Sequence, residues 1–540
     1  MAESPIAPAV STKPMVRPEG PPGRVDLLVV GGGIVGGAIA RDAALRGLSV
    51  ALIEKRDFGS GTTAASTRLI HGGLRYLEIF DFGLVRESLR ERQVLLNTAP
   101  HLVRPLLFLA PVYRTSPWSP SRLRLGLTLY DLLSWGRSVP SHQWLSRDRV
   151  LQEEPGLDPA GLLGGGTYYD AQVDLPERLC LEYVLQAFDQ GAWVANYARA
   201  ERFLKEGSAV AGVQATDLES GAPWELRAEI TVNAAGPWAD DLAERASTRD
   251  HRLRLTKGVH LVMPSFTQHA VVLRARSDGR LFFAVPWLGY TLLGTTDTDY
   301  RGDLDHVPTA EEDARYLLAE ASHAFPNLGR LGVNSATAGL RALVPSRAAE
   351  ESATSRKDRV VDHAAEGVPG LISVLGGKIT AARHIAERVV DLACRKLGRG
   401  SSPCRTHVTP THYGTAPKGR PDSCQGSLYG ARQALIERMA LADPDLARPL
   451  LKGEPVLWAQ VDFGVRYEGV RTAADLLLRR TALGYRDGHA LEVAGAVAGR
   501  IAALLGRDEA AAEADFRAYQ EAVERLEPQA KGWGGEEVKR

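Results

Sequence analysis

The chain has no excess of charge of either sign. Its 540 residues include 65 lysines and arginines and 65 aspartates and glutamates. Nucleic acids and other polyanions are bound through clustered positive charge, so this balance gives no support for a nucleic-acid partner. A charged function must therefore depend on local groups of residues.

Cysteine is scarce, and its four positions follow no metal-binding pattern. No two of the residues Cys180, Cys394, Cys404 and Cys424 form a CxxC pair, which is the usual beginning of a zinc site or a dithiol redox centre. The sequence therefore predicts no metal site. We expect idle, buried thiols in a reducing compartment.

Long apolar runs are also missing. No window of about 18 residues is apolar, so no segment is predicted to span a bilayer. The first 24 residues contain six prolines and lack the apolar core of a secretory signal. We interpret residues 1–24 as a disordered tail.

A glycine-rich turn follows the first short apolar run. Residues 25–30 (VDLLVV) are typical of a strand buried on both faces, and GGGIVGGAIA follows at 31–40. Gly31, Gly33 and Gly36 match G-x-G-x-x-G. In this motif the first glycine allows the turn, the second lets a pyrophosphate approach the backbone, and the third lets the helix pack on the strand.

An acidic residue ends the next predicted strand. A helix over 34–46 stops before Gly47, and LSVALIE predicts a strand ending at Glu54, 23 residues after Gly31. A carboxylate at this place accepts hydrogen bonds from ribose hydroxyls and repels a 2'-phosphate. The pattern predicts a dinucleotide site that disfavours NADP, and it does not separate NAD from FAD.

The segment after this strand favours a flavin. Residues 58–77 (FGSGTTAASTRLIHGGLRYL) have few charges and many small residues. Their amides and hydroxyls, including those of Ser60, Thr62, Thr63, Ser66 and Thr67, can line a long dinucleotide. Gly72 and Gly73 would let the chain pass close to a flat ring. A solvated surface loop is the alternative interpretation.

This segment is very similar to one in the FAD-dependent glycerol-3-phosphate dehydrogenases. The likeness begins with STRLIHGGLRYLE (66–78) and continues in the same order along the chain. The further motifs are NAAGPWADDL (233–242), KGVHLVMP (257–264), FAVPW (283–287), LLGTTDTDYRGD (292–303) and SVLGGKITAARHIAE (373–387). Amine and hydroxyacid oxidases of the same superfamily share the first motif and the NAAG-like strand. The middle motifs are therefore the ones that distinguish the glycerol-3-phosphate dehydrogenases from these oxidases.

These observations imply an α/β fold: a doubly wound, Rossmann-like FAD-binding domain, an antiparallel-sheet substrate domain and a C-terminal helical cap. ITVNAAG predicts a second buried strand beside the first, with Pro237 opening a helix. LISVLGGKITAARHIAE repeats strand, turn and helix, and the N-terminus of that helix can face the flavin and stabilise negative charge on it. Asp278 and Gly279 indicate a hairpin in the substrate sheet.

The length predicts two or three domains. We expect a discontinuous FAD-binding domain over 25–400, with an interleaved substrate-binding domain mainly at 250–355. Residues 401–425 are interpreted as a linker and 426–540 as the helical domain. Residues 461–484 resemble the cap of the same dehydrogenases. The arginines of this cap, Arg471, Arg479 and Arg480, are expected to form ion pairs between helix and domain.

FAD is the expected cofactor, and five stretches of the chain are expected to contact it. The residues are Gly31, Gly33, Ile34, Val35, Gly36, Glu54, Lys55, Thr62, Thr63, Ser66, Thr67, Arg68, Leu69, His71, Gly72, Gly73, Ala235, Gly236, Gly377, Lys378, Ile379 and Thr380.

The resemblance implies oxidation of sn-glycerol 3-phosphate to dihydroxyacetone phosphate, with a hydride passing from C2 to the flavin. A phosphate dianion needs cationic groups, and the hydroxyl proton needs a base. The family pattern places the substrate contacts at Arg75, Tyr76, Arg341, Arg356 and Lys378. The chain has Arg-Ala at Arg341 where the family has Arg-Pro, which keeps the guanidinium, and the match around Arg356 is loose.

Three residues are candidates for the catalytic proton acceptor. His71 lies in the segment that approaches the flavin, although a structural histidine is the alternative. Lys378 is a base only if burial deprotonates it, and as a cation it would anchor phosphate or the flavin edge. Asp297, in GTTDT, is expected to orient other groups.

Residues 101–150 are locally basic, with seven arginines against two aspartates, a charge of +5, and with Trp118, Trp135 and Trp144 among them. The segment 121–136 predicts a helix with an apolar side suited to a membrane surface, and core packing is the alternative. The residues of this side are Leu125, Leu129, Leu132 and Leu133.

Members of the resembling family lie on the inner face of the bacterial membrane and reduce quinone. The resemblance therefore implies a cytoplasmic protein held peripherally at the membrane, with quinone as acceptor. One alternative is an oxygen-reducing glycerophosphate oxidase, although such oxidases usually carry an insertion that is missing here. Others are a flavin oxidoreductase for amines or hydroxy acids and a flavin-binding sensor without turnover. A homodimer stays open.

Overall fold

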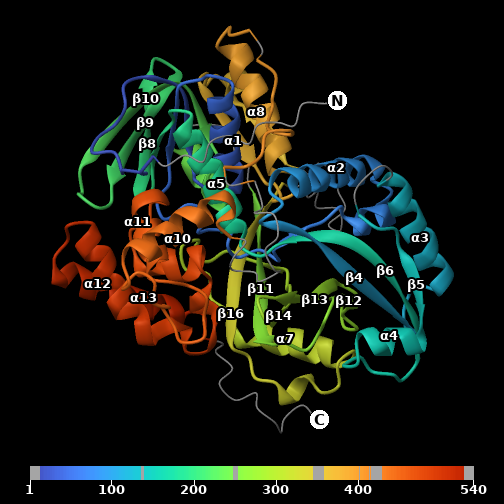
Figure 1. Cartoon of the computed structure of the whole chain (residues 1–540). Coiled ribbons are helices and arrows are strands. Elements are labelled where there is room, and N and C mark those ends of the chain that lie inside the picture. Colours follow the sequence, from blue (N-terminus) through green and yellow to red (C-terminus); the bar gives the residue numbers. More distant parts are fainter. Residues whose placement is uncertain are drawn as a thin grey trace, which may run out of the picture.

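Two β-sheets and a helical C-terminal domain make up the computed structural model of the protein. Residues 13–134, 139–246, 253–344, 358–400, 402–412, 414 and 428–527 are described. In Figure 1 the first sheet lies in the upper part, the second sheet at the right, and the C-terminal helices at the lower left. The predicted α/β class is confirmed.

The first sheet is mainly parallel, in the order β17-β18-β10-β1-β2-β7. Its strands are β1 (Val25–Val30), β2 (Val50–Ile53), β7 (Trp193–Ala195), β10 (Pro223–Asn233), β17 (Arg359–Asp362) and β18 (Leu371–Leu375). Strand β1 pairs in parallel with β10 and β2, and β10 pairs in parallel with β18. The two apolar runs that predicted neighbouring strands therefore lie side by side, as expected.

Different layers cover the two faces of this sheet. Leu27 and Val29 belong to the core shared with α1 (Ile34–Leu45), α5 (Pro176–Asp189) and α8 (Ala382–Lys396). Val25 and Leu28 belong to a second core, beneath an antiparallel layer of β8 (Ala198–Glu206), β9 (Ala209–Asp217) and the start of β10. Burial on both sides explains why the run is apolar throughout.

The second sheet is antiparallel except where β12 meets β4. Its main order is β15-β11-β14-β13-β12-β4-β6-β3, with β16 beside β11 and β5 beside β6. The strands are β3 (Leu69–Ile70), β4 (Val103–Tyr113), β5 (Gln143–Ser146), β6 (Leu162–Val173), β11 (Arg254–Pro264), β12 (Ala270–Arg274), β13 (Leu281–Trp287), β14 (Tyr290–Gly294), β15 (Thr298–Asp299) and β16 (Ser335–Leu343). Asp278 and Gly279 lie in the predicted hairpin between β12 and β13.

This sheet draws on more of the chain than the predicted substrate domain at 250–355. Four of its strands, β3 to β6, come from residues 69–173. The chain leaves the first sheet once after β2 and again after β10, and both excursions build the same sheet. Local sequence patterns cannot reveal this, because strand pairing between distant segments is decided by tertiary packing.

The remaining helices flank one of the sheets or form the C-terminal domain. Helices α2 (Phe82–Thr98), α3 (Pro120–Leu133), α4 (Arg147–Glu153) and α7 (Glu311–Ser322) flank the second sheet, and α6 (Ala239–Glu244) packs against β10 and β18 of the first. The C-terminal domain contains α10 (Gln433–Ala442), α11 (Ala459–Tyr467), the π-helical turn η6 (Asp475–Arg480), α12 (Leu491–Leu504) and α13 (Glu509–Glu524). Short helices are η1 (Leu74–Ile79), η2 (Gly236–Trp238), η3 (Leu328–Arg330), η4 (His363–Glu366), η5 (Gly430–Arg432), η7 (Leu483–Tyr485) and η8 (Asp487–Ala490).

The predicted disordered tail does not extend over residues 13–24. The Met15 amide donates to the carbonyl oxygen of Arg466 at 2.9 Å, and Met15 is buried. Arg17 forms an ion pair with Asp217 at 2.5 Å. Prolines prevent regular secondary structure here, but they allow an extended strand-like path that packs on both domains.

Three of the four cysteines, Cys180, Cys394 and Cys404, are buried free thiols, and Cys424 lies outside the described residues. Among the helices that are described, none has the length and apolarity needed to cross a membrane.

Candidate active site

A cavity of about 660 Å³ lies between the two sheets. One end is bounded by the carboxyl ends of β1, β2, β10 and β18, which is where open parallel sheets bind ligands. The other end is bounded by β11 and β16 of the second sheet. A volume of this size is typical of a cofactor or small-molecule site.

The glycine turn between β1 and α1 has the geometry of a dinucleotide site. Gly31 has a φ of +108°, and a Cβ there would lie 2.6 Å from the carbonyl oxygen of Ala234. A Cβ at Gly36 would lie 1.8 Å from the carbonyl oxygen of Gly31, so Gly36 allows close packing behind the cavity wall. Gly33 and Ile34 lie on the wall, where the N-terminus of α1 suits a pyrophosphate.

The acidic residue at the end of β2 also lies on the wall. Glu54 accepts hydrogen bonds from the amide of Gly32 at 2.7 Å and from the amide of Arg56 at 2.9 Å. Burial raises the pKa of the Glu54 carboxyl, although both amides and the neighbouring Lys55 and Arg56 oppose the shift. The carboxylate is therefore held in a fixed orientation beside the glycine turn, where the ribose of a dinucleotide would lie.

Small hydroxylated side chains line the middle of the cavity. The Thr63 hydroxyl accepts a hydrogen bond from the Ile34 amide at 3.1 Å, and the Thr62 hydroxyl donates to the carbonyl oxygen of Leu340 at 2.8 Å. The Thr67 hydroxyl forms a hydrogen bond with His260 on β11 at 2.9 Å. These contacts connect the loop after β2 to both sheets, so the loop forms a fixed wall.

Most of the residues expected to contact the cofactor lie on this wall. They are Gly31, Gly33, Ile34, Val35, Glu54, Lys55, Thr62, Thr63, Ser66, Thr67, Arg68, Leu69, His71, Ala235, Gly236, Gly377, Lys378, Ile379 and Thr380. Gly36, Gly72 and Gly73 lie behind the described wall. A Cβ at Gly72 would lie 2.2 Å from the Tyr130 hydroxyl, and one at Gly73 would lie 2.3 Å from the Tyr76 ring. These two glycines therefore permit close packing against side chains, and their contact with the cofactor stays a prediction.

Lys378 and Tyr76 form the polar end of the cavity together with His71. The Lys378 ammonium lies 4.2 Å from the centroid of the Tyr76 ring. Its Nζ is buried and makes no hydrogen bond among the described residues. His71, between β3 and η1, and Tyr76, within η1, lie on the same wall. A buried cation without a hydrogen-bond acceptor favours a bound anion.

Arg341 adds a second cation from β16. Its guanidinium donates to Asp297 at 3.1 Å and to the Thr295 hydroxyl at 2.9 Å, and it lies on the cavity wall. Asp297 lies behind the described wall, and Arg280 is also 3.4 Å from its carboxylate. The geometry gives Asp297 an orienting contact to Arg341.

His260 is a cavity residue that the sequence analysis did not single out. It is 2% exposed, and its Nε2 lies 2.9 Å from the Thr67 hydroxyl. Burial, reinforced by the charges of Arg341 and Arg68, lowers the pKa of His260 to about 3. The imidazole is therefore neutral near pH 7. The sequence signal that could have identified His260 as a site residue is its position inside the motif KGVHLVMP.

The side chains of two predicted substrate contacts, Arg75 and Arg356, are not among those that the structure describes. Arg356 lies outside the described residues, and of Arg75 the structure describes the backbone, within η1.

Comparisons with known proteins agree with the fold and the cavity. Residues 26–383 match the family of FAD dependent oxidoreductases, and residues 426–512 match the C-terminal domain of alpha-glycerophosphate oxidase. The glycine turn, the ribose-side carboxylate and the hydroxylated loop are the groups that an FAD site requires, so the residues present fit this cofactor.

Curated relatives and a solved structure narrow the family. A glycerol-3-phosphate dehydrogenase of Synechocystis sp. is 39% identical, over 85% of this chain and 88% of its own length. An aerobic glycerol-3-phosphate dehydrogenase of Staphylococcus haemolyticus is 34% identical, over 84% of this chain and 86% of its own.

The solved glycerol-3-phosphate dehydrogenase of Bacillus halodurans, complexed with FAD, has a TM-score of 0.77 and 31% identity, covering 94% of this chain and 96% of its own. A solved L-alpha-glycerophosphate oxidase of Mycoplasma pneumoniae, at 19% identity and a TM-score of 0.54, shares the fold. The chain belongs to the FAD dependent oxidoreductase family and, within it, to the glycerol-3-phosphate dehydrogenases.

Proposed function

We propose that the protein oxidises sn-glycerol 3-phosphate to dihydroxyacetone phosphate, with FAD as the hydride acceptor and quinone as the final acceptor. The observation that carries the proposal is the buried Lys378 ammonium, which has no hydrogen-bond acceptor among the described residues and faces a cavity suited to FAD. The names of the relatives support the same substrate.

The chain's own groups provide the binding half of this reaction. Lys378 and Arg341 supply two positive charges for the phosphate dianion, and Tyr76 packs against the lysine to limit its orientation. Asp297 holds the Arg341 guanidinium through a 3.1 Å contact. A bound FAD would supply the acceptor for the hydride of C2.

We assign removal of the hydroxyl proton to His71. The residue lies on the cavity wall near Tyr76, and histidine is the side chain that most often acts as a general base. His260, kept neutral by its lowered pKa, is assigned to a hydrogen-bonding role.

Anaerobic bleaching of the flavin absorbance tests the substrate. The holoenzyme should bleach with sn-glycerol 3-phosphate, and it should keep its absorbance with secondary amines and with hydroxy acids that lack phosphate. Bleaching by an amine or a hydroxy acid alone would replace this proposal with another flavin oxidoreductase. No bleaching by any of them would favour a flavin-binding sensor.

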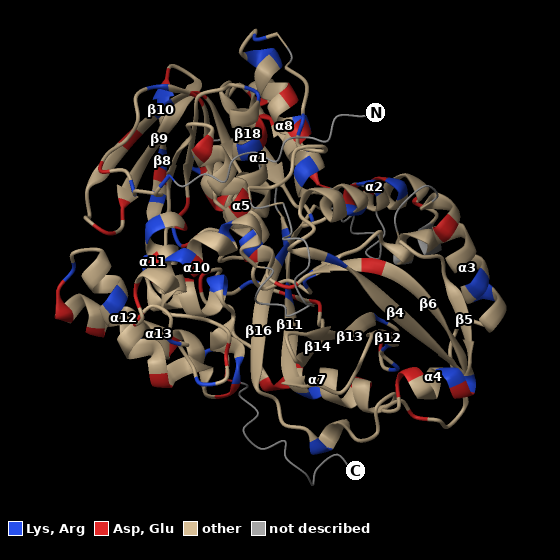
Figure 2. Cartoon of the chain, in the orientation of Figure 1, with Lys and Arg blue, Asp and Glu red and all other residues tan. Residues whose placement is uncertain are grey.

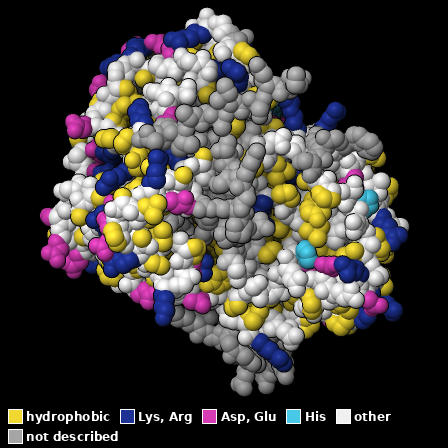
Figure 3. Space-filling model, in the orientation of Figure 1, with side chains coloured by type: hydrophobic (Ala, Val, Ile, Leu, Met, Phe, Trp, Pro, Cys, Tyr) yellow, Lys and Arg dark blue, Asp and Glu magenta, His cyan; other side chains and the backbone are white. Residues whose placement is uncertain are grey.

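The apolar side of α3 supports peripheral attachment to a membrane. Leu125 is 71% exposed and Leu132 60%. Phe80, which directly follows η1, an element in contact with α3, is 76% exposed. Helix α3 lies at the edge of the molecule in Figure 1, and in Figure 3 apolar side chains also gather over the second sheet. The arginines Arg122 and Arg124 are exposed on the same helix, which suits anionic lipid headgroups.

Vesicle pelleting tests this attachment. The double substitution Leu125→Glu and Leu132→Glu should abolish co-sedimentation with vesicles that contain anionic lipid, because it removes exposed apolar area and adds negative charge. Leu441→Glu is the matched control, since Leu441 is also exposed but lies on α10. Equal binding by the double variant and the control would contradict the assignment of α3.

The yield of hydrogen peroxide distinguishes the acceptors. With a quinone analogue present, the enzyme should reduce the quinone and release little peroxide. Stoichiometric peroxide in air, with no quinone reduction, would identify an oxidase.

A further inference from the structure

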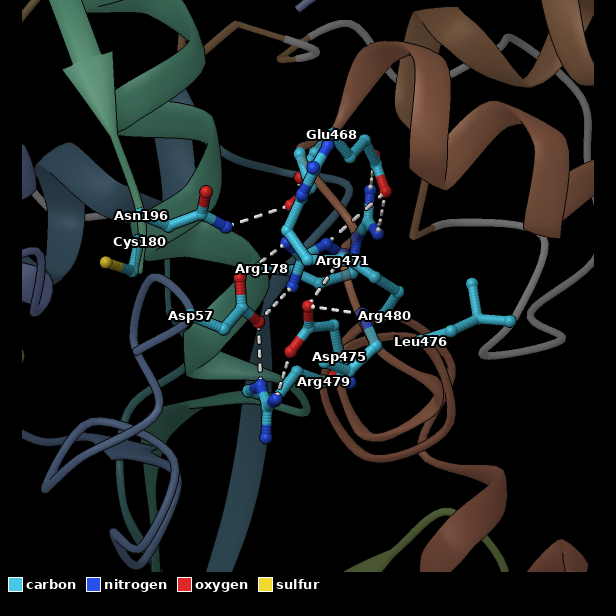
Figure 4. A network of polar contacts seen from close by, with 12 residues as sticks. Asp57, Arg178, Cys180, Asn196, Glu468, Arg471, Asp475, Leu476, Arg479 and Arg480 are labelled. Carbon is cyan, nitrogen blue, oxygen red and sulfur yellow. Dashed lines mark hydrogen bonds and ion pairs between the residues drawn. The ribbon is translucent and has the colours of Figure 1, made fainter. Parts of the chain in front are cut away.

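The boundary between the C-terminal domain and the first domain is rich in charged residues (Figure 2), and a buried acid lies at its centre. Arg480 donates to both carboxylate oxygens of Asp57, at 2.8 and 2.9 Å. Arg479 donates to the same carboxylate at 2.6 Å. Asp57 and Arg480 are fully buried. Figure 4 shows both guanidinium groups directed at this one side chain.

Asp57, Arg479 and Arg480 all have partners of opposite charge or polarity. Burial opposes ionisation of Asp57, but Arg480 and Arg479 outweigh it and lower its pKa below the ordinary value. Arg480 also donates to the carbonyl oxygen of Glu468 at 2.8 Å, and Arg479 pairs with Asp475. A buried charge of this kind is strongly destabilising when its partner is removed, so Asp57 stays ionised and bound.

Asp57 belongs to the loop that forms the cofactor side of the cavity. Residues 53–56 and 59–63, on both sides of it, line the cavity. The Asp57 carbonyl oxygen accepts from the Ser60 amide at 3.2 Å. The Gly59 amide then donates to the carbonyl oxygen of Gly32 at 2.9 Å. Asp57 is therefore connected through the backbone of its own loop to the glycine turn at the start of α1.

A second contact connects the same domain with the cavity. The Arg68 guanidinium, on the cavity wall, lies 4.4 Å from the Trp287 ring centroid and 5.7 Å from that of Tyr485 in the C-terminal domain. The Trp287 and Tyr485 rings pack edge to face at 5.4 Å. Two separate side-chain contacts therefore join the C-terminal domain to the residues that surround the cofactor.

The local backbone allows neighbouring arginines to act together. Consecutive residues of a regular α-helix do not face one another, yet Arg479 and Arg480 both reach Asp57. They end the π-helical turn η6 (Asp475–Arg480), a geometry that is uncommon and is found most often at functional sites.

We propose that Arg479 and Arg480 are positioning residues for FAD: by clamping Asp57 they hold the loop at 55–63 in the shape that the cofactor site requires. FAD is then retained only while the C-terminal domain is docked on the first domain. The C-terminal domain acts on the cofactor without touching the reacting atoms.

The test compares FAD affinity across matched interface variants. The FAD dissociation constant is measured by reconstituting the apoprotein and following flavin fluorescence. Arg480→Gln should raise this constant by about tenfold or more, while the KM for substrate at saturating FAD stays unchanged. Arg480→Lys, which keeps the charge but loses the two-pronged contact, should fall between wild type and Arg480→Gln.

Arg471→Gln is the control. Arg471 pairs with Glu219 at 2.6 Å across the same boundary, and its side chain contacts neither Asp57 nor Glu468. It should lower the unfolding temperature and leave FAD affinity within about twofold of wild type. If Arg471→Gln weakens FAD as much as Arg480→Gln, the effect is general undocking and the proposal is wrong. Folded Arg480→Gln or Arg480→Lys protein with wild-type FAD affinity would also overturn it.

Discussion

At the scale of single residues, two cations on the cavity wall are the groups suited to a phosphate. Lys378 and Arg341 face the cavity from different sheets, and Arg341 is oriented by Asp297. Lys378 packs on Tyr76 and lacks a hydrogen-bond acceptor within the described part of the chain. A buried cation without an acceptor lowers the stability of the fold but can bind an anionic ligand. Replacing Lys378 should therefore reduce turnover more than stability.

Lys378→Met should therefore lower kcat/KM for sn-glycerol 3-phosphate by about 100-fold or more, because a charge-assisted contact to the phosphate or flavin edge is lost. The protein should remain folded and retain FAD. Stopped-flow flavin reduction measures the loss. Lys396→Met is the control, since Lys396 pairs with Asp362 away from the cavity wall. A reduction rate near that of wild type would remove Lys378 from the site.

At the scale of elements, the glycines of the first turn separate into the two classes that the motif predicts. A Cβ at Gly36 would lie 1.8 Å from the backbone of Gly31, whereas a Cβ at Gly33 finds its nearest neighbour, the Thr63 hydroxyl, at 3.6 Å. Gly36 serves the contact between helix and strand. Gly33 keeps space on the cavity side of the wall.

Gly36→Ala should destabilise the protein severely, because neither α1 nor β1 can move without disturbing the sheet. Gly33→Ala should leave the unfolding temperature of the apoprotein close to that of wild type and weaken FAD binding by about tenfold or more. Thermal unfolding of the apoproteins and FAD titration separate the two effects. Equal instability of both apoproteins would contradict the distinction.

At the scale of the whole molecule, the C-terminal domain is tied to the rest by buried ion pairs. The predicted pairs of Arg471, Arg479 and Arg480 are confirmed: Arg471 binds Glu219 at 2.6 Å, and the other two bind Asp57. Arrangements of this kind make the stability of the molecule depend on pH. The pKa of Asp57 is lowered in the folded protein, whereas that of the half-buried Asp515 on α13 is raised. The two carboxyls therefore change the free energy of unfolding with pH in opposite directions.

Burial, together with the charge of Asp475, raises the pKa of Asp515 from 3.8 to about 6, although the Ala473 amide and Arg507 oppose the shift. Between these values the folded protein holds a proton that the unfolded chain has released. The free energy of unfolding therefore falls as pH rises from 3.8 to about 6. Asp515→Asn should remove this loss and stabilise the protein at pH 7 by no more than about 3 kcal/mol.

Denaturant unfolding of wild type and variant at pH 4 and pH 7 measures this effect. The difference between the two proteins should be larger at pH 7, because wild-type Asp515 is then ionised. A difference that is the same at both pH values would show that Asp515 does not titrate as described.

The amino-acid sequence by itself determined the βαβ unit of residues 25–54 and the flavin family, and most of the cofactor contacts that it predicted lie on the cavity wall. Turn, helix and strand signals are local, and each motif keeps its residues within a few positions of one another. The same locality identified the helical character of the C-terminal domain and the orienting role considered for Asp297.

Tertiary structure alone decided which segments share a sheet, which glycines face the cavity, and how the C-terminal domain reaches the cofactor loop. Strands β3 to β6 join a sheet whose other strands begin near residue 254. Asp57 meets Arg480 across more than 400 positions of sequence. His260 becomes a cavity residue because β11 lies against Thr67. Such contacts depend on packing between distant surfaces, and no local pattern of residues encodes them.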